Sequence, residues 1–373
     1  MSIPAPNLRS SRSELAICSA VHLILPNPRG FCAGVRMAID VVDRVIGLFP
    51  GEQVYVYHEI VHNKHVVSRF KDQGVIFVED VEDVPRGKIV VFSAHGISPQ
   101  VRSLAKERGL TAIDATCPLV TKVHAEAIRY ARQGYQILLI GHRNHQEVAG
   151  TFGEAPDSTQ IVQSPEDIPT LSIKDPNRVV YLTQTTLSTD DAQIVIDALR
   201  KAFPNIKEPP SSDICYATTN RQHAVRQLAP ECDVVIVIGS QNSSNSVRLT
   251  EISGNLGTPG YLIDDVSEVN WAWFKTGKER VLVTAGASAP EDLVAKVCRT
   301  LLERFGGTIE QREIFDEDVE FAPPGLLRKI MEKRGIDSAA GGFSFTAPAI
   351  THDLYGGTPL TISATSNQTS THT

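Results

Sequence analysis

Short runs of apolar residues, rich in valine and isoleucine, recur along the chain between segments with helical spacing. The runs lie at 22–25, 88–95, 136–142, 179–185, 234–240 and 281–286. Continuous apolar runs of this length are typical of parallel strands that are buried on both faces. Between the runs, apolar residues recur every three or four positions, as at Val35, Ile39, Val42, Ile46 and Phe49. Strands that alternate with amphipathic helices predict an α/β fold.

Most of the predicted strands end in small, polar or reactive residues. These ends are His95–Gly96, Gly141–His142, 183–186, Gly239–Ser240 and 286–288. In open parallel sheets, ligands bind beyond the carboxyl ends of the strands, where helix N-termini offer free N–H groups to anions. We therefore expect several sheets to direct these ends toward one common centre.

Composition and charge describe a folded protein. The chain has 373 residues, 42% of them hydrophobic and 21% charged, which predicts two or three units and disfavours a disordered or fibrous protein. The net charge of −7 disfavours a nucleic-acid-binding surface, and no apolar stretch is long enough to span a membrane. Residues 1–20 hold no apolar run of a signal peptide, so we expect a cytoplasmic protein with a loose leader. A transit-like segment is the minority alternative.

Six cysteines in so long a chain do not indicate a disulfide framework. For Cys18, Cys232 and Cys298 we expect small buried apolar side chains. In contrast, Cys32, Cys117 and Cys215 each follow an apparent strand end and begin a helical stretch, where the helix dipole is expected to lower a thiol pKa. Zinc sites usually have cysteine pairs two to four residues apart, and this chain has none. Thiolates prefer iron–sulfur clusters or zinc, and a site with three thiolates leaves one metal position open for a substrate. The alternative for these three cysteines is also a small buried apolar side chain.

Histidines cluster at predicted strand ends and in loops. They are His58, His62, His65, His95, His124, His142 and His145. A single histidine is more often a satisfied polar group than a catalyst, but the clustering favours a functional site. Glu147 lies two residues after His145, so the two could deliver a proton together. The alternative is a surface carboxylate.

Hydroxyl and amide side chains lie just beyond three of the strands, at 183–188, 239–249 and 285–292. Ordinary helix capping is one explanation, because Ser, Thr and Asn are preferred caps. The other is a cradle for a diphosphate, built from these side chains and from helix N-termini. Neither a P-loop nor a dinucleotide-binding glycine motif occurs, so an anion must be held in another way.

Nine motifs together resemble one known family. In chain order they are NPRGFCAGV, HEIVHN, FSAHGIS, DATCPLVTKVH, GHRNHQEVAGT, TQTTLS, DICYATTNRQ, GSQNSSNS and TAGASAPEDLV. They resemble the LytB/IspH family of 4-hydroxy-3-methylbut-2-enyl diphosphate reductases, over about residues 21 to 324. The resemblance implies an α/β trefoil of three domains, with mostly parallel sheets, around a central iron–sulfur site. The expected units are a flexible leader at 1–20, domains at 34–116, 117–212 and 21–33 plus 213–324, and a disordered tail at 338–373.

The resemblance also implies the reaction and its site. One 4Fe-4S cluster would be held by Cys32, Cys117 and Cys215, with its fourth iron left for the hydroxyl oxygen of the substrate. The diphosphate would be held by His62, His95, Ser243, Ser244, Asn245 and Ser288. The hydroxymethyl end would lie near His145, Thr185, Thr186 and the proton donor Glu147. The products would be isopentenyl and dimethylallyl diphosphate, in the last step of the non-mevalonate isoprenoid pathway. A ferredoxin or flavodoxin would supply the electrons.

Two departures from the family pattern and two rival functions accompany this interpretation. Met37 stands where an arginine is expected, with Arg36 one position early, and Gln146 stands where relatives often have proline.

One rival enzyme is another three-domain, three-cysteine cluster protein such as a quinolinate synthase. The rival of a different class is a non-catalytic protein whose cysteines hold zinc structurally.

Overall fold

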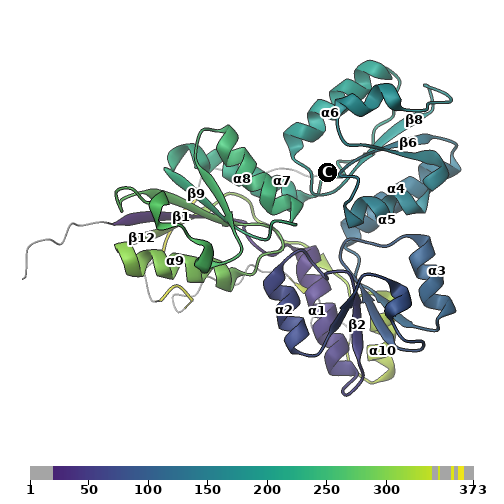
Figure 1. Ribbon diagram of the computed structural model, residues 1–373, viewed down its shortest axis with the longest axis horizontal. Coiled ribbons are helices and arrows are strands. Elements are labelled where there is room, and N and C mark those ends of the chain that lie inside the picture. Colours follow the sequence, from purple (N-terminus) through teal and green to yellow (C-terminus); the bar gives the residue numbers. More distant parts are fainter. Residues whose placement is uncertain (1–19, 338–342, 345–353, 357–359, 365–373) are drawn as a thin grey trace, which may run out of the picture.

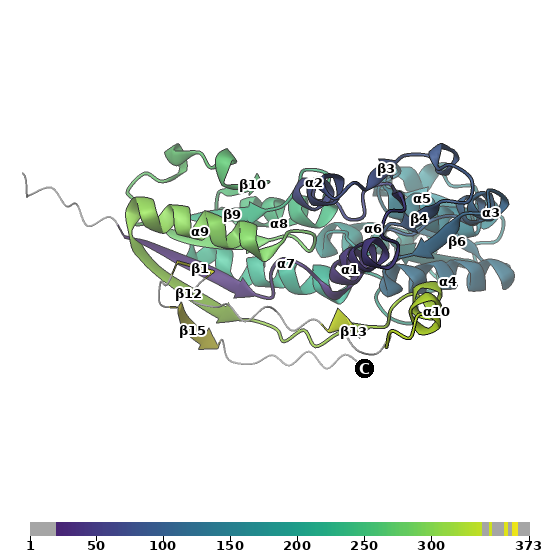
Figure 2. The same ribbon diagram turned by 90° about the horizontal axis from the view of Figure 1, so that it is seen from below.

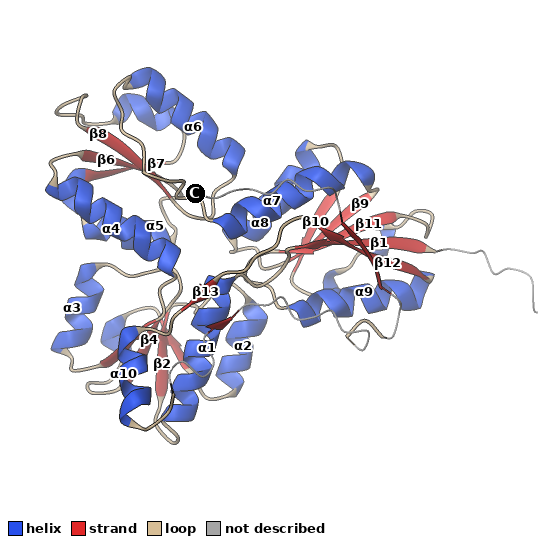
Figure 3. Ribbon diagram, turned by 180° about the vertical axis from the view of Figure 1, so that it is seen from behind, coloured by secondary structure: helices blue, strands red, loops and turns tan. Residues whose placement is uncertain are grey.

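The computed structural model describes residues 20–337, 343–344, 354–356 and 360–364. They form three lobes around a common centre, each built on a parallel β-sheet (Figure 1). Helices cover the sheets of all three lobes (Figure 3). The predicted α/β trefoil is therefore confirmed. Within the described ranges, no helix is both long and apolar enough to cross a membrane.

The first lobe has a four-stranded sheet in the order β3-β2-β4-β5. Its strands are β2 (Val54–Tyr57), β3 (Ile76–Val78), β4 (Ile89–Phe92) and β5 (Thr111–Asp114). Its helices are α1 (Ala33–Leu48), α2 (Lys64–Asp72) and α3 (Pro99–Glu107). A late segment of the chain, α10 (Gly325–Lys333), also packs here, because Leu327 and Met331 are buried in the same core as Met37. Met37 therefore fills a packing position.

The second lobe has a three-stranded sheet in the order β7-β6-β8. Its strands are β6 (Gln136–Ile140), β7 (Thr159–Val162) and β8 (Val179–Thr183). Its helices are α4 (Pro118–Arg132), α5 (Gln146–Glu154) and α6 (Thr189–Ala202). Short 3-10 helices lie in the second lobe at Pro156–Ser158 and Pro165–Thr170, in the first at Val81–Asp83, and in the third at Ala229–Glu231, Val266–Glu268 and Trp271–Trp273.

The third lobe has a six-stranded sheet in the order β10-β9-β11-β1-β12-β15. Its strands are β1 (Val21–Asn27), β9 (Val234–Ile238), β10 (Gly260–Ile263), β11 (Arg280–Ala285), β12 (Gly307–Glu313) and β15 (Leu360–Ala364). Its helices are α7 (Tyr216–Leu228), α8 (Ser244–Asn255) and α9 (Glu291–Phe305). The first strand, β1, lies between two late strands, β11 and β12, and pairs with both in parallel. Figure 2 shows β1, β12 and β15 side by side.

The segment predicted to be a disordered tail, 338–373, forms structure where it is described. Strand β15 pairs with β12, and β14 (Phe343–Ser344) pairs with β13 (Glu320–Phe321) in a two-stranded antiparallel sheet. Tyr355 is fully buried, and its hydroxyl donates to Glu291 at 2.5 Å. In these stretches the prediction of disorder was wrong, because strand pairing and one buried aromatic ring hold a segment that is poor in charge. The rest of the segment, and residues 1–19 of the predicted leader, lie outside the described residues.

The apolar runs are continuous because the sheets are covered on both sides. In β9 every residue is buried. Val234, Ile236 and Ile238 face one core, while Val235 and Val237 face another. Alternate side chains of a strand point to opposite faces, so two covered faces require apolar residues at every position. The domain boundaries given above stay a prediction.

Candidate active site

A pocket that is partly open to solvent is lined by all thirteen residues that the sequence singled out for the site. They are Cys32, His62, His95, Cys117, His145, Glu147, Thr185, Thr186, Cys215, Ser243, Ser244, Asn245 and Ser288. These residues come from segments of all three lobes. The expectation of one common centre is confirmed in its geometry, while the role of each residue stays a prediction.

Each of the three cysteines is the N-cap residue of a helix: Cys32 of α1, Cys117 of α4 and Cys215 of α7. The expected strand before the helix exists for Cys32 and Cys117, which follow β1 and β5. It does not exist for Cys215, which follows a loop after α6 with an isolated bridge at Lys207. Instead, the Cys215 N–H donates to the Thr185 carbonyl at 3.0 Å, which places this thiol beside the end of β8.

Glycine at position 34 allows α1 to approach Cys117. A Cβ atom built on Gly34 would lie 2.5 Å from Cys117 Sγ. No real Cβ tolerates such a contact, so a larger residue would push the helix that begins at Cys32 away from Cys117. The close approach of these two ligand candidates therefore depends on the glycine.

Burial raises the pKa of all three thiols. For Cys32, desolvation is the largest effect, and Arg221 and backbone N–H groups at the start of α1 oppose it. Desolvation likewise raises the pKa of Cys117, and it raises that of Cys215 to about 11. The expectation of lowered thiol pKa values was therefore wrong, because the loss of water outweighs the helix N-terminus. Thiols of this kind become ligands when a metal displaces the proton.

Three histidine rings meet on one side of the pocket. The His62 and His95 rings stack with centroids 4.0 Å apart, and His145 meets them edge-on at 5.4 and 6.0 Å. Burial, with the neighbouring rings, lowers the pKa of His95 well below its ordinary value and that of His145 to about 3. His145 Nδ1 accepts from the Glu147 N–H at 3.2 Å, so its Nε2 carries the proton. Both His95 and His145 are therefore neutral.

Two residues without an assigned role support His62. Glu59 Oε2 lies 3.1 Å from His62 Nδ1 and accepts from Asn242 Nδ2 at 2.7 Å. A carboxylate at Nδ1 fixes the tautomer and leaves Nε2 free for another partner. Both residues lie inside or beside quoted motifs, but nothing in the sequence pairs them, because 183 residues separate them along the chain.

Three serines lie at the start of α8 and beside it, and the hydroxyl groups of two of them donate to backbone carbonyls. Ser243 is the N-cap, Ser244 Oγ donates to the Thr186 carbonyl at 3.0 Å, and Ser288 Oγ donates to the His62 carbonyl at 2.8 Å. Among the described residues that line the pocket there is no lysine or arginine. An anion here would be held by the helix N-terminus and by neutral donors.

Asn245 carries the clearest sign of an absent partner. Its side chain is 3% exposed, and neither its amide nitrogen nor its amide oxygen has a hydrogen-bond partner within the described residues. Buried polar groups are almost always paired, so an amide left without a partner in a pocket indicates a ligand.

Glu147 is buried in the first turn of α5, with 3% of its surface exposed. Thr185 donates to it twice, from the backbone N–H to Oε1 at 2.6 Å and from the hydroxyl to Oε2 at 3.0 Å. Burial raises the pKa of Glu147 to about 7, although the Thr185 bonds oppose this. The expected pairing with His145 is through the backbone, and the carboxylate itself is bonded to Thr185.

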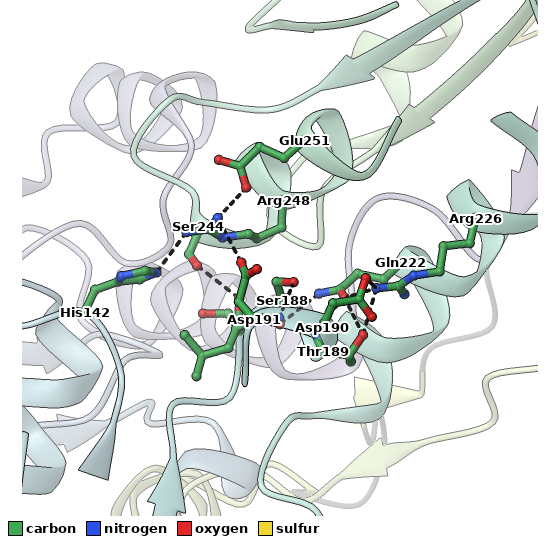
Figure 4. A network of polar contacts seen from close by, with 12 residues as sticks. His142, Ser188, Thr189, Asp190, Asp191, Gln222, Arg226, Ser244, Arg248 and Glu251 are labelled. Atoms are coloured by element: carbon green, nitrogen blue, oxygen red, sulfur yellow. Dashed lines mark hydrogen bonds and ion pairs between the residues drawn. The ribbon is translucent and has the colours of Figure 1, made fainter. Parts of the chain in front are cut away.

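The segment that carries Thr185 and Thr186 is fastened to the third lobe by polar contacts (Figure 4). Gln222 of α7 donates to the Leu187 carbonyl at 2.8 Å and accepts from the Thr189 N–H at 3.0 Å. Arg226 donates to Asp190 at 2.9 Å, and Arg248 of α8 donates to His142 at 3.3 Å. The Gln222 and Arg226 bonds connect the segment after β8 with the helix that begins at Cys215, and the Arg248 bond connects the end of β6 with α8.

Within the described ranges, no three His, Cys, Asp or Glu side chains are placed so that they could hold a single metal ion. Thiolates on a single zinc ion at about 2.3 Å must lie within roughly 4 Å of one another. A four-iron cluster holds its thiolates on separate iron atoms, so its ligands are spaced more widely.

Comparison with known proteins gives a consistent result. The model of the family described as LytB protein matches residues 23–302. A 4-hydroxy-3-methylbut-2-enyl diphosphate reductase of Idiomarina loihiensis is 52% identical over 311 residues, 83% of this chain and 98% of the relative. A protein of the same name from Acidothermus cellulolyticus is 51% identical over 315 residues, 84% of this chain and 92% of the relative.

Solved structures agree. The structure of an E-1-hydroxy-2-methyl-but-2-enyl-4-diphosphate reductase from Plasmodium falciparum superposes with a TM-score of 0.82 at 40% identity, and covers 85% of this chain and 99% of its own. A structure described as (E)-4-hydroxy-3-methyl-but-2-enyl diphosphate reductase, the terminal enzyme of the non-mevalonate pathway, has a TM-score of 0.57 at 34% identity. It covers 76% of this chain and 99% of its own.

Proposed function

The chain belongs to the LytB protein family, and from this premise we propose that it reduces 4-hydroxy-3-methylbut-2-enyl diphosphate to isopentenyl and dimethylallyl diphosphate. This is the last step of the non-mevalonate isoprenoid pathway. The observation that carries the proposal is one pocket that combines three thiols, a buried carboxylic acid and a set of neutral polar side chains that can bind an anion by hydrogen bonds. The reaction removes a hydroxyl group, so each turnover consumes two electrons and two protons and releases water.

Cys32, Cys117 and Cys215 hold one 4Fe-4S cluster. The support is that three helix N-cap thiols from distant parts of the chain line the same pocket. Thiolate sulfur is the ligand that iron–sulfur clusters use. When bound, the cluster supplies electrons and a Lewis acid for the hydroxyl group of the substrate.

The diphosphate binds to His62, His95, Ser243, Ser244, Asn245 and Ser288. The unpaired amide of Asn245 and the N-terminus of α8 support this assignment, because both offer hydrogen bonds that the protein itself does not use. The Glu59 carboxylate orients His62 through a hydrogen bond at the Nδ1 atom of the ring. Since the donors are neutral, recognition depends on hydrogen-bond geometry more than on net positive charge.

Glu147 donates the proton with which the hydroxyl group leaves as water, near His145, Thr185 and Thr186. With a pKa of about 7, its carboxyl group is protonated in a large share of molecules at neutral pH. After proton transfer, the two Thr185 bonds stabilise the carboxylate that remains. Burial thus makes the acid available, and Thr185 keeps it from becoming too weak to donate.

The finer assignments follow the family. A ferredoxin or flavodoxin delivers electrons one at a time to the cluster, and the protein works in the cytoplasm. Both statements rest on the resemblance of the nine motifs, and neither is needed for the assignment of the reaction.

Anaerobic purification and assay test the proposal. The expected protein is brown, contains about four iron atoms per chain, and converts the hydroxymethylbutenyl diphosphate to both products when a chemical reductant is supplied. A colourless protein loaded with zinc would instead support the structural zinc site. A brown protein that leaves the diphosphate unchanged would contradict the assigned reaction but keep the cluster.

A further inference from the structure

The largest fully buried side chain among the described residues is an arginine. Arg221 is 0% exposed and lies on α7, the helix that begins at Cys215. Its Nε and Nη2 donate to the Gly30 carbonyl at 3.0 and 2.8 Å. Gly30 precedes Cys32 by two residues. One guanidinium group therefore connects the helix of one cluster ligand with the loop of another.

The rest of that loop is held by β11 and the turn that follows it. The Gly30 N–H donates to the Ala285 carbonyl at 3.1 Å, and the Cys32 N–H donates to the Ala287 carbonyl at 3.2 Å. Gly30 has a φ of +64°, and a Cβ atom there would lie 2.9 Å from the Ala289 carbonyl oxygen. These contacts leave the backbone of the loop little freedom. The Arg221 guanidinium adds two further bonds to the Gly30 carbonyl.

A carboxylate from a third segment pairs with the arginine. Glu317, between β12 and β13, accepts from Arg221 Nη1 at 3.1 Å and from Asn220 Nδ2 at 3.0 Å. The two side chains of the ion pair are 0% and 5% exposed. Burying two charges is costly, and well-packed apolar residues of similar size are often no less stable. The stability of the fold alone therefore does not explain the pair.

Both charges of the pair lie close to the Cys32 loop, because Arg221 donates to the Gly30 carbonyl and Glu317 accepts from Arg221. Reduction adds one negative charge to a cluster. A buried positive charge beside the cluster stabilises that added charge and raises the reduction potential, whereas a buried negative charge lowers it.

We propose that Arg221 and Glu317 are positioning residues that hold the Cys32 loop against the Cys215 helix and set the reduction potential of the cluster by their opposed charges. The proposal rests on the cluster assignment made above. It concerns how readily the cluster takes up an electron.

Anaerobic redox titration, followed by visible absorption and electron paramagnetic resonance, tests this with three variants. Glu317→Gln is expected to shift the reduction potential to a more positive value, and Arg221→Gln to a more negative one. The double variant is expected to return close to the original potential. Arg200→Gln is the control, because Arg200 is an exposed arginine that pairs with Glu208 and does not line the pocket, and the potential of this variant is expected to stay unchanged.

The iron content of each purified variant is measured in parallel, together with the melting temperature of its cluster-free form. Shifts of the two single variants in the same direction, or no shift in Glu317→Gln at unchanged iron content, would overturn the proposal. If Arg221→Gln does not fold, Glu317→Gln and Arg221→Lys decide, since lysine keeps the charge and loses the paired bonds to Gly30. An unmodified protein that binds no cluster would refute the cluster assignment, whereas an intact cluster with unshifted potentials refutes only this inference.

Discussion

Thr185 donates both of its hydrogen bonds to one carboxylate, that of Glu147, at 2.6 and 3.0 Å. The carbonyl group of the same threonine accepts from the N–H of Cys215 at 3.0 Å. One residue at the end of β8 thus connects the proposed proton donor of the second lobe with a proposed cluster ligand beside the third. The position of the acid relative to the cluster is set by this short chain of bonds.

Glu147→Gln is expected to lower turnover by roughly a hundredfold to ten-thousandfold, because the amide keeps the shape of the side chain and has no proton to give. The measurement is the anaerobic kcat, with iron content as control for an intact cluster. Near-normal turnover would rule out Glu147 as the proton donor.

The pH dependence of turnover follows from the same carboxyl group. Burial raises the pKa of Glu147 from its ordinary 4.5 to about 7, so the protonated form is lost as the pH rises through about 7. The rate is therefore expected to fall between roughly pH 6 and pH 8. His145, with a pKa of about 3, does not titrate in this window. A rate that does not change with pH would contradict the assignment.

Thr185→Val removes a hydroxyl bond that lowers the pKa of Glu147. The decrease in rate is therefore expected to occur at a higher pH in this variant.

Cys215→Ala is expected to lose nearly all cluster iron, because a cluster held by three thiolates is left with two. Cys298→Ala is the control, since Cys298 is buried in the core of the third lobe. Its loss should cost about 1 kcal/mol of stability and leave the iron content unchanged. Equal iron content in the two variants would argue against Cys215 as a ligand.

Asn245→Leu is expected to weaken substrate binding and to stabilise the protein. The amide has no partner within the described residues, so its burial costs free energy that a branched apolar side chain would recover, by about 1 kcal/mol. Chemical denaturation of the cluster-free protein measures the gain, and KM for the diphosphate measures the loss. A destabilised variant with unchanged KM would show that Asn245 is structural.

Gln146→Pro restores the residue that family members often carry and is expected to stabilise the cluster-free protein by about 0.5–1 kcal/mol. Gln146 is the first residue of α5, where proline is favoured because the N–H has no partner inside the helix. The preceding His145 already has an extended backbone that suits a following proline. A lower melting temperature would show that the glutamine side chain, which contacts His95, contributes more than the backbone gain.

The sequence predicted those parts of the fold that depend on local pattern. The run Val234–Ile238 is a buried strand because each of its side chains meets an apolar core, and this is visible in five consecutive letters. Motif order was equally informative, since the thirteen candidate residues line one pocket. Resemblance, and not spacing, selected these thirteen from the many polar residues near strand ends.

Features that depend on distant neighbours were missed. The net direction of the thiol pKa shifts depends on how much water is excluded, which only the assembled lobes determine. The pair of Glu59 with Asn242, and the burial of Tyr355 against Glu291, join segments far apart in the chain. No periodicity in a single sequence carries such information.

The place of β1 in its sheet has a consequence for how the molecule is made. A ribosome releases Val21–Asn27 early, but the strands on both sides of it begin only at Arg280 and Gly307. The first strand must therefore wait until most of the chain has emerged before it gains its neighbours, while the strands at 54–114 and 136–183 can pair sooner. Since Cys32 follows β1 closely, we expect the pocket that contains the proposed cluster ligands to assemble only in the final stage of synthesis.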